Sequence, residues 1–203
     1  METLIAFLNS LHPLSQALIE HLLKTVKSKT ISKNEIILRP PQINRDIVFI
    51  AKGILRAYYV KDGEEVNSWF MKEGDVIVSI TSFYNQVPTF EYIQALEECT
   101  IFYISFEELN FIYTSYIEFN VVGRILLQKY LILWDEVLHG LRQNTVKERY
   151  LWLLENHSEL ITRVPQKHIA SWLGISRFNM SRIKSTIYHP IKEISKKEKT
   201  VTG

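Results

Sequence analysis

The stretch QKHIASWLGISRFNMSRIKS, residues 166–185, has the pattern of a helix-turn-helix. Ala170 is small enough for a second helix to approach closely, and Gly174 stands where the first helix must end and reverse, a position that favours tolerance of positive φ. Ser176 is a good N-cap for the second helix. Apolar residues occupy the places where the two helices need contacts: Ile169, Leu173, Ile175, Met180 and Ile183.

The second predicted helix presents polar and basic side chains opposite its Met180 and Ile183 face. A helix that enters the major groove of DNA needs such groups, because Arg can bond a guanine edge through two N–H groups, while Ser and Asn can bond phosphates or bases. An ordinary helix pair with solvated arginines is the simpler alternative. The agreement of apolar, small, glycine and basic positions favours DNA binding. The candidate DNA-binding residues are Gln166, Lys167, Ser176, Arg177, Phe178, Asn179, Ser181, Arg182 and Lys184.

Charge is divided unevenly along the chain. Residues 141–203 hold 12 Lys and Arg against 5 Asp and Glu, a net charge of +7, whereas residues 1–140 have a net charge of −5. The basic end contains the predicted helix-turn-helix. This asymmetry indicates that one end of the chain meets a polyanion and the other does not.

Length and composition narrow the class of protein. With 203 residues, 46% of them hydrophobic and 23% charged, the chain is expected to fold as a soluble globular protein with two small domains rather than one large one. No apolar run approaches the roughly 20 residues of a membrane span, and the N-terminus lacks a basic segment before an apolar one, so we expect a cytoplasmic protein. Cys99 is the single cysteine, which excludes an internal disulfide and an iron–sulfur cluster on this chain's cysteines.

Short runs rich in Ile, Val, Tyr and Phe fill residues 35–105 and predict β structure. The sharpest hairpin signal is KDGE at 61–64, because Asp-Gly fits a tight turn that requires positive φ. Many short strands without intervening long helices predict a sandwich or barrel. The candidate strands are Glu35–Leu38, Asp46–Ala51, Gly53–Val60, Glu65–Met71, Asp75–Ile80, Tyr92–Ala95 and Cys99–Ile104.

Helical patterns flank this β region. The first 30 residues have apolar groups at helical spacing, and Ser105 with Glu108 has the spacing of a capping box. The segment Tyr116–Arg142 contains no proline and has apolar residues on more than one side. A helix of that length is roughly 40 Å long, so we expect it to contact both its own barrel and a homodimer partner. A purely intramolecular core helix is the alternative, since Lys129 and Asp135 interrupt the heptad pattern.

A polar segment follows the long predicted helix and marks a hinge between domains at residues 142–145. Thr145 then has the pattern of an N-cap, with Glu148 three residues later. Between this helix and the helix-turn-helix, Thr162–Val164 is a candidate edge strand.

This order of parts resembles the Crp/Fnr family of bacterial transcription regulators over nearly the whole chain. The most specific matching segments are VPQKHIA at 164–170, LGISR at 173–177 and SRI at 181–183; GILRAY at 53–58, DGE at 62–64 and GD at 74–75 are less diagnostic. The resemblance implies an α+β fold with a jelly-roll, cyclic-nucleotide-binding-like barrel at 1–115, a dimerisation helix at 116–142 and a winged helix-turn-helix at 143–203. It also implies a homodimer that places two recognition helices in successive major grooves of a roughly palindromic site, with RNA polymerase as a further partner.

The resemblance also assigns roles to individual residues. Arg177 and Arg182 match the two base-reading arginines of the family, while Gln166, Ser176 and Asn179 match positions that usually hold phosphates. Phe178 stands where many members have a glutamate that accepts from a cytosine amino group. Phe cannot make that bond but can touch a thymine methyl, so we expect a different half-site preference.

Cyclic AMP is an unfavourable ligand for this barrel. The family binds it through a Gly-Glu pair followed about ten residues later by Arg-Ser or Arg-Thr, and residues 78–92 have no such arrangement. From Glu73 to Gly123 there is no Lys, Arg or His, against eight acidic residues. Because a buried cyclic phosphate requires a cation or a nest of N–H groups, we expect no cofactor here. The barrel would then be degenerate, a scaffold, or a site for an apolar or neutral ligand.

The sequence contains no motif for a haem site, a metal site or an enzyme active site. His139 could in principle ligate haem, but a single His in a helix is more often a packing or solvated residue, and the remaining histidines show no metal-ligand spacing. No nucleophile motif is present, so we expect neither a metal site nor an enzyme. Two alternatives to a DNA-binding regulator remain: a ligand- or protein-binding barrel module whose helix-turn-helix serves protein contact, and a cyclic-nucleotide-responsive activator.

Overall fold

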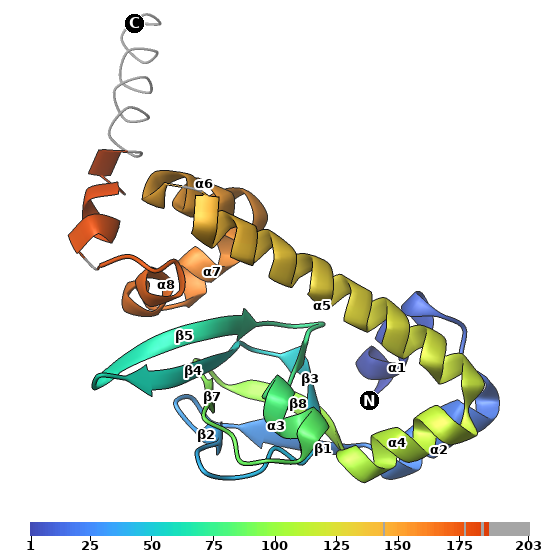
Figure 1. Ribbon diagram of the computed structural model, residues 1–203. Coiled ribbons are helices and arrows are strands. Elements are labelled where there is room, and N and C mark those ends of the chain that lie inside the picture. The colour runs from blue at the N-terminus through green and yellow to red at the C-terminus, as the bar shows by residue number, and fades with distance from the viewer. Residues whose placement is uncertain (144, 177, 184, 187–203) are drawn as a thin grey trace, which may run out of the picture. The chain divides into compact units, whose positions relative to one another are not determined.

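The computed structural model describes residues 1–143, 145–176, 178–183 and 185–186 (Figure 1). The chain divides into two compact units, Met1–Glu136 and Val137–Gly203. The candidate residues Arg177 and Lys184 lie outside the described residues, as does the C-terminal segment from 187 onward. No helix within the described residues combines the length and apolar character that a membrane span requires.

The first unit contains two antiparallel four-stranded sheets, which give the predicted jelly-roll architecture. Sheet A has the order β1-β8-β3-β6, and sheet B has the order β2-β7-β4-β5. The strands are β1 (Lys27–Ile31), β2 (Ile36–Leu38), β3 (Asp46–Lys52), β4 (Leu55–Lys61), β5 (Glu64–Met71), β6 (Val76–Ile77), β7 (Tyr92–Ala95) and β8 (Cys99–Ser105).

Local sequence explains the turn and the faces of these sheets. Asp62 (φ 53°) and Gly63 (φ 80°) both adopt positive φ between β4 and β5, as the predicted Asp-Gly hairpin requires. In sheet A, Phe49 pairs with Phe102, and both pack against helices. Val48, which precedes Phe49, lies on the opposite face toward sheet B. At Val48 and Phe49 of β3, sheet A is therefore buried on both faces.

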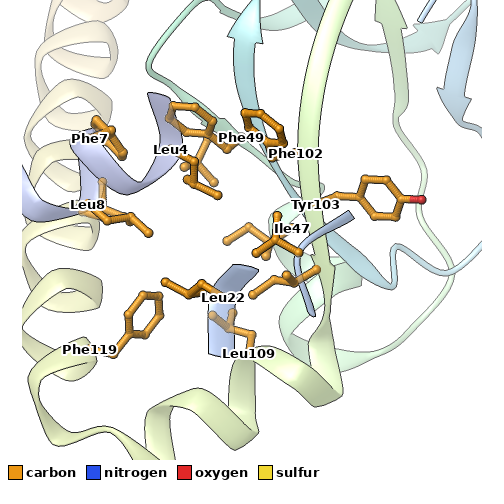
Figure 2. A pocket seen from close by; sticks show the side chains of 14 residues that line it. Leu4, Phe7, Leu8, Leu22, Ile47, Phe49, Phe102, Tyr103, Leu109 and Phe119 are labelled. Carbon is orange, nitrogen blue, oxygen red and sulfur yellow. The ribbon is translucent and has the colours of Figure 1, made fainter. Parts of the chain in front are cut away.

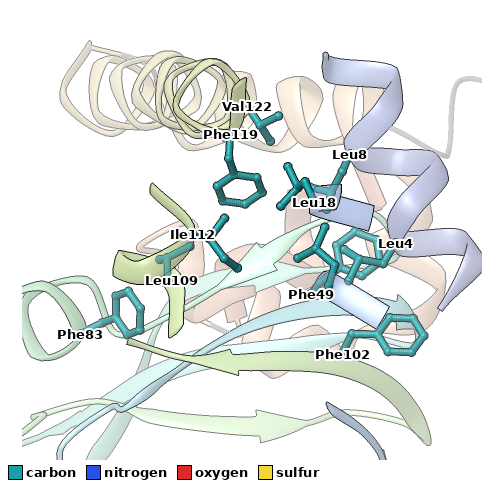
Figure 3. Packing of buried hydrophobic residues seen from close by; sticks show 11 residues of the cluster. Leu4, Leu8, Leu18, Phe49, Phe83, Phe102, Leu109, Ile112, Phe119 and Val122 are labelled. Carbon is teal, nitrogen blue, oxygen red and sulfur yellow. The ribbon is translucent and has the colours of Figure 1, made fainter. Parts of the chain in front are cut away.

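Four helices cover the outer face of sheet A. They are α1 (Glu2–Leu11), α2 (Gln16–Thr25), α4 (Phe106–Ser115) and the first half of α5 (Ile117–Gln143). Ser15 caps α2 by accepting from the Leu18 N–H (3.2 Å), and Ser105 caps α4 by accepting from the Glu108 N–H (3.1 Å). Figure 3 shows the apolar side chains that these helices bury against sheet A. Each fully buried Leu or Phe there contributes about 1.5–3 kcal/mol to folding.

Two elements of the first unit differ from the sequence prediction. The predicted strand Asp75–Ile80 ends at Ile77, and a short helix, α3 (Ile80–Asn85), begins at its last residue. Strand β6 pairs with β3 through only two residues, and beyond them the Ser79 N–H donates to the Asn44 side chain (2.7 Å) instead of to a neighbouring strand. Strand β1 was not predicted, because four of its five side chains are exposed and polar, as in an edge strand.

The second unit is helical within its described residues. It contains α6 (Val146–Asn156), α7 (Ser158–Arg163), α8 (Gln166–Trp172) and helical residues 178–183 and 185–186. Helix α6 begins as predicted, because Thr145 and Glu148 form a complete capping box. The predicted edge strand Thr162–Val164 is wrong: its first two residues end α7, and the Val164 N–H donates to the Leu160 carbonyl (2.8 Å) in helical fashion. The described part of this unit contains no strand that would form a wing.

Candidate functional site

The turn after α8 has the geometry that its sequence predicts. Gly174 adopts φ +65°, its N–H donates to the Ser171 carbonyl (3.1 Å), and the Ile175 N–H donates to the Ala170 carbonyl (2.9 Å). These two bonds form a Schellman motif, which satisfies the last carbonyls of α8 and reverses the chain. The following segment therefore leaves α8 in a fixed direction.

A new helical segment starts directly after this turn. The Asn179 N–H donates to the Ser176 hydroxyl (3.2 Å), and the Met180 N–H donates to the Ser176 carbonyl (3.0 Å), so Ser176 is the N-cap that the sequence predicted. Met180 is fully buried, as are Tyr150 and Leu153 of α6. The buried side anchors the segment and leaves its other sides in solvent.

Seven of the nine candidate DNA-binding residues are described, and all seven are exposed. Gln166 and Lys167 stand at the start of α8, and the other five lie on or just before the following helical segment: Ser176, Phe178, Asn179, Ser181 and Arg182. Phe178 is 74% exposed, although moving an aromatic ring out of water is favourable. The fold thus gathers polar, basic and aromatic groups on the solvent side of two neighbouring helical segments.

A second exposed surface follows α5. Five accessible apolar side chains are spaced alternately by four and three residues along this helix: Leu127, Leu131, Trp134, Leu138 and Leu141. This is the spacing of a coiled-coil seam. Ile117 and Ile132 of α5 are exposed as well but are not part of this run. Lys129 and Asp135, which interrupt the pattern in the sequence, do not belong to this set; Lys129 instead reaches Asp75 on the barrel (3.1 Å). We call these five residues the α5 seam.

The first unit contains a small apolar cavity between α1, sheet A and α5 (Figure 2). Its volume is about 70 Å³, and its walls include Leu4, Leu8 and Phe119. In Figure 2 the hydroxyl of Tyr103 points away from the other side chains. A cavity without convergent polar groups gives a ligand no directional contact, so this one is a packing feature.

A larger cavity, of about 470 Å³, lies between β4, β5, β6, α3 and α5. We call it the aromatic cavity, because seven of its lining residues carry rings: Tyr59, Trp69, Tyr84, Phe90, Tyr113, Tyr130 and Trp134. Trp69 and Trp134 pack edge to face with centroids 5.2 Å apart, which joins β5 to α5. The Tyr130 hydroxyl accepts from the Val76 N–H (2.6 Å) and ties α5 to β6.

The cavity contains one charged side chain among its described lining residues, Glu91. The Ser79 hydroxyl donates to the Glu91 Oε2 (3.0 Å) and lies 2.9 Å from the Thr89 hydroxyl. Since each hydroxyl has one proton, Ser79 directs its proton at the carboxylate and accepts from Thr89. Both hydroxyls are buried, and the Thr89 hydroxyl also accepts from the Glu91 N–H (2.9 Å) and lies 3.2 Å from the Glu91 carbonyl oxygen.

The tyrosines of the cavity add no charge. Burial raises the pKa of Tyr84, raises that of Tyr113 to about 12, and raises that of Tyr130 well above its ordinary value. Their hydroxyls therefore stay protonated at neutral pH. The electrostatic character of the cavity is set by the Glu91 carboxylate and the ring faces.

Arg56, a buried cation next to the lining residue Ala57 in the sequence, faces away from the aromatic cavity. Arg56 precedes the lining residue Ala57 along β4, so its side chain projects from the opposite face of sheet B. It is 3% exposed and is held by Glu65 (2.7 Å) and by Gln94 (2.6 Å). It cannot neutralise an anion in the aromatic cavity.

Metal chemistry has no support within the described residues. They contain no group of three or more His, Cys, Asp and Glu side chains placed to hold an ion. Cys99 is buried, and burial raises the pKa of its thiol to about 11, so it is a poor ligand and a poor nucleophile at neutral pH.

Comparison with known proteins identifies the fold of the barrel. Residues 28–116 match the family model of the cyclic nucleotide-binding domain. No curated protein matches the chain at a significant level.

Solved structures resemble the chain beyond the barrel. A CooA mutant from Carboxydothermus hydrogenoformans is 20% identical with a TM-score of 0.67 and covers 87% of this chain and 86% of its own. The c-di-GMP-responsive global regulator CLP of Xanthomonas campestris is 16% identical with a TM-score of 0.69 over 87% and 93%. FixK2 from Bradyrhizobium japonicum is 18% identical with a TM-score of 0.68 over 82% and 86%. At these identities the likeness shows the fold.

The ligand named by the family model does not fit the aromatic cavity. A cyclic nucleotide brings a phosphate with a full negative charge, and the described lining residues offer it no Lys, Arg or His. Glu91 would repel it, and the nearby hydroxyls of Ser79 and Thr89 already donate elsewhere. That the chain does not bind cyclic AMP stays a prediction.

Sequence reasoning missed part of this site. It counted Glu91 among the acidic residues that oppose a phosphate, but it did not place the carboxylate beside rings from β5 and α5. The period of four and three along α5 was present in the sequence as a signal, yet burial was needed to show which of its side chains stay accessible. Two residues of the α5 seam, Leu127 and Trp134, also line the aromatic cavity.

Proposed function

We propose that this chain is a DNA-binding transcription regulator of the Crp/Fnr type that acts as a homodimer on a roughly palindromic site. The observation that carries the proposal is the exposed group formed by Phe178, Asn179 and Arg182 on a helical segment anchored by buried Met180. A polar and basic helix face held rigidly on a small helical unit matches what a helix in the major groove requires. The net charge of +7 on residues 141–203 supports the same assignment.

The α5 seam supports the homodimer. Five apolar side chains at coiled-coil spacing remain accessible in the isolated chain. In a two-fold homodimer the same five residues of a second α5 would pack against them and cover them. Two-fold pairing of this kind requires two half-sites in the DNA, which leads to the palindromic operator.

The Crp/Fnr assignment gains support from the matched cyclic nucleotide-binding domain and from the fold shared with the global regulator CLP. We propose a regulator that does not respond to cyclic AMP, because the aromatic cavity lacks a cation for the phosphate. We also propose that the chain has no catalytic activity.

Binding-site selection from random DNA, followed by titration of the selected duplex, tests the proposal. We expect Arg182→Ala to weaken binding by about 1–3 kcal/mol and to relax the preference at one position of each half-site. Lys147→Ala removes an exposed charge on α6 outside the candidate surface and is the matched control. Unchanged specific binding by both Arg177→Ala and Arg182→Ala would show that the recognition helix is assigned wrongly.

Salt dependence distinguishes the proposal from a barrel module whose helices contact protein. A DNA-binding protein loses affinity steeply as salt rises, because phosphate contacts release counterions. No measurable DNA affinity at low salt would favour the module. Cyclic AMP should leave the melting temperature unchanged, and a rise would favour the cyclic-nucleotide-responsive activator.

A further inference from the structure

The carboxylate in the aromatic cavity has no cation. Glu91 is half-buried, and no described Lys, Arg or His forms an ion pair with it. Other carboxylates of the first unit do have such partners: Glu65 binds Arg56 (2.7 Å), and Asp75 binds Lys129 (3.1 Å). A carboxylate beside apolar surface loses solvation that a single hydroxyl does not replace, so a positive group in the cavity would stabilise it.

Seven aromatic rings line the same cavity as Glu91, and aromatic rings attract cations. Trp69 and Trp134 meet at 61°, and Tyr59 and Phe90 meet at 67° with centroids 6.1 Å apart. In each edge-to-face pair the edge of one ring covers one face of the other, so the uncovered, electron-rich faces are those that can meet a ligand. Such faces attract ammonium groups, most strongly those of tryptophan, when the cation is partly desolvated.

The volume and lining set the size and kind of ligand. At about 470 Å³ the aromatic cavity falls in the range of small-molecule sites. Most of its lining is apolar, so a ligand must bring an apolar body as well as a charge. Rim residues such as Ile80 and Phe90 are exposed, which leaves an entry path from solvent.

We propose that the aromatic cavity binds a small organic cation, an amine carrying an aromatic or branched apolar group, whose ammonium lies between the Glu91 carboxylate and the surrounding rings. Ser79 orients the carboxylate through its hydroxyl. This ligand has the opposite charge to a cyclic nucleotide. The inference does not depend on DNA binding, because its test contains no DNA.

Three ligands with the same phenyl group and different charges test the proposal on the full chain. The probes are 2-phenylethylamine, 2-phenylethanol and phenylacetate, which carry a positive, no and a negative charge at pH 7. Isothermal titration calorimetry and thermal melting report their binding. We expect the amine to bind at least about tenfold more tightly than the alcohol, and phenylacetate to bind weakest.

The variant Glu91→Gln assigns the preference to one carboxylate. Glutamine retains an oxygen that accepts from Ser79, so the barrel should fold, as far-UV circular dichroism would show. We expect the amine and the alcohol to bind this variant with similar affinity. Glu64→Gln, at an exposed position outside the cavity, should keep the wild-type preference.

Several results would overturn the proposal. They are equal affinity of the wild type for amine and alcohol, tightest binding by phenylacetate, and an unchanged preference in Glu91→Gln. The absence of binding by every probe, as expected if a second copy of the chain fills the cavity in the dimer, would overturn it as well.

Discussion

Truncating one residue of the α5 seam should weaken the homodimer strongly. Leu131 is 70% exposed in the isolated chain, the most accessible member of the seam. Full burial of a leucine side chain contributes about 1.5–3 kcal/mol, so covering the exposed part contributes about 1–2 kcal/mol in each copy. The dimer contains two copies of the residue. Since alanine retains the β-carbon, Leu131→Ala should cost about 2–3 kcal/mol and raise the dimer dissociation constant roughly 30- to 150-fold.

The neighbouring residue provides the matched control. Ile132 is also apolar and is 60% exposed, but it lies about 100° around the helix from Leu131. If a second α5 covers the seam, Ile132 remains in solvent, and Ile132→Ala should change the dissociation constant by less than about threefold. Both variants keep the surface of α5 that packs on the barrel.

Sedimentation equilibrium across a range of protein concentrations measures the dissociation constants, and circular dichroism verifies the fold of each variant. Three outcomes would refute the reasoning: a wild-type chain that stays monomeric at about 100 µM, equal dissociation constants for Leu131→Ala and the wild type, or a larger effect of Ile132→Ala. The last result would place the interface on another side of α5.

Three further changes test particular contacts. Gly174→Ala forces a side chain into left-handed backbone with its β-carbon 3.3 Å from the Arg149 Nη1, so we expect the second unit to lose about 1–2 kcal/mol in urea unfolding; unchanged stability would show that the turn relaxes. Gly123→Ala places a β-carbon 2.5 Å from the Tyr113 hydroxyl, and this overpacking should lower the stability of the first unit by about 1–3 kcal/mol, measured by calorimetry. Cys99, with a pKa of about 11, carries roughly one thiolate per thousand molecules at pH 8, against about a quarter for free cysteine, so iodoacetamide should label it about 200-fold more slowly, with the rate still rising tenfold per pH unit above pH 9. Labelling at the rate of free cysteine would contradict its burial.

Local signals in the sequence predicted those parts of the fold that depend on few neighbouring residues. The Asp62-Gly63 hairpin, the Ser105 and Thr145 caps and the turn at Gly174 form as predicted, because each is closed by hydrogen bonds over three to five residues or by a backbone conformation that glycine permits. The prediction failed where a partner from elsewhere decided the outcome. Ile80 begins a helix because β6 has no partner beyond Ile77.

Periodicity along the chain was enough to predict the β character of residues 35–105 and the long helix. The basic C-terminal end and the lack of a phosphate motif follow directly from charge and residue type. The tertiary structure decided which side chains stay exposed on α5 and which residues surround Glu91. Rings from the β4–β5 hairpin and from α5 are far apart in sequence, and their place around one cavity follows from strand order and helix packing. Those long-range contacts leave no local pattern, because each residue is equally suited to an ordinary core.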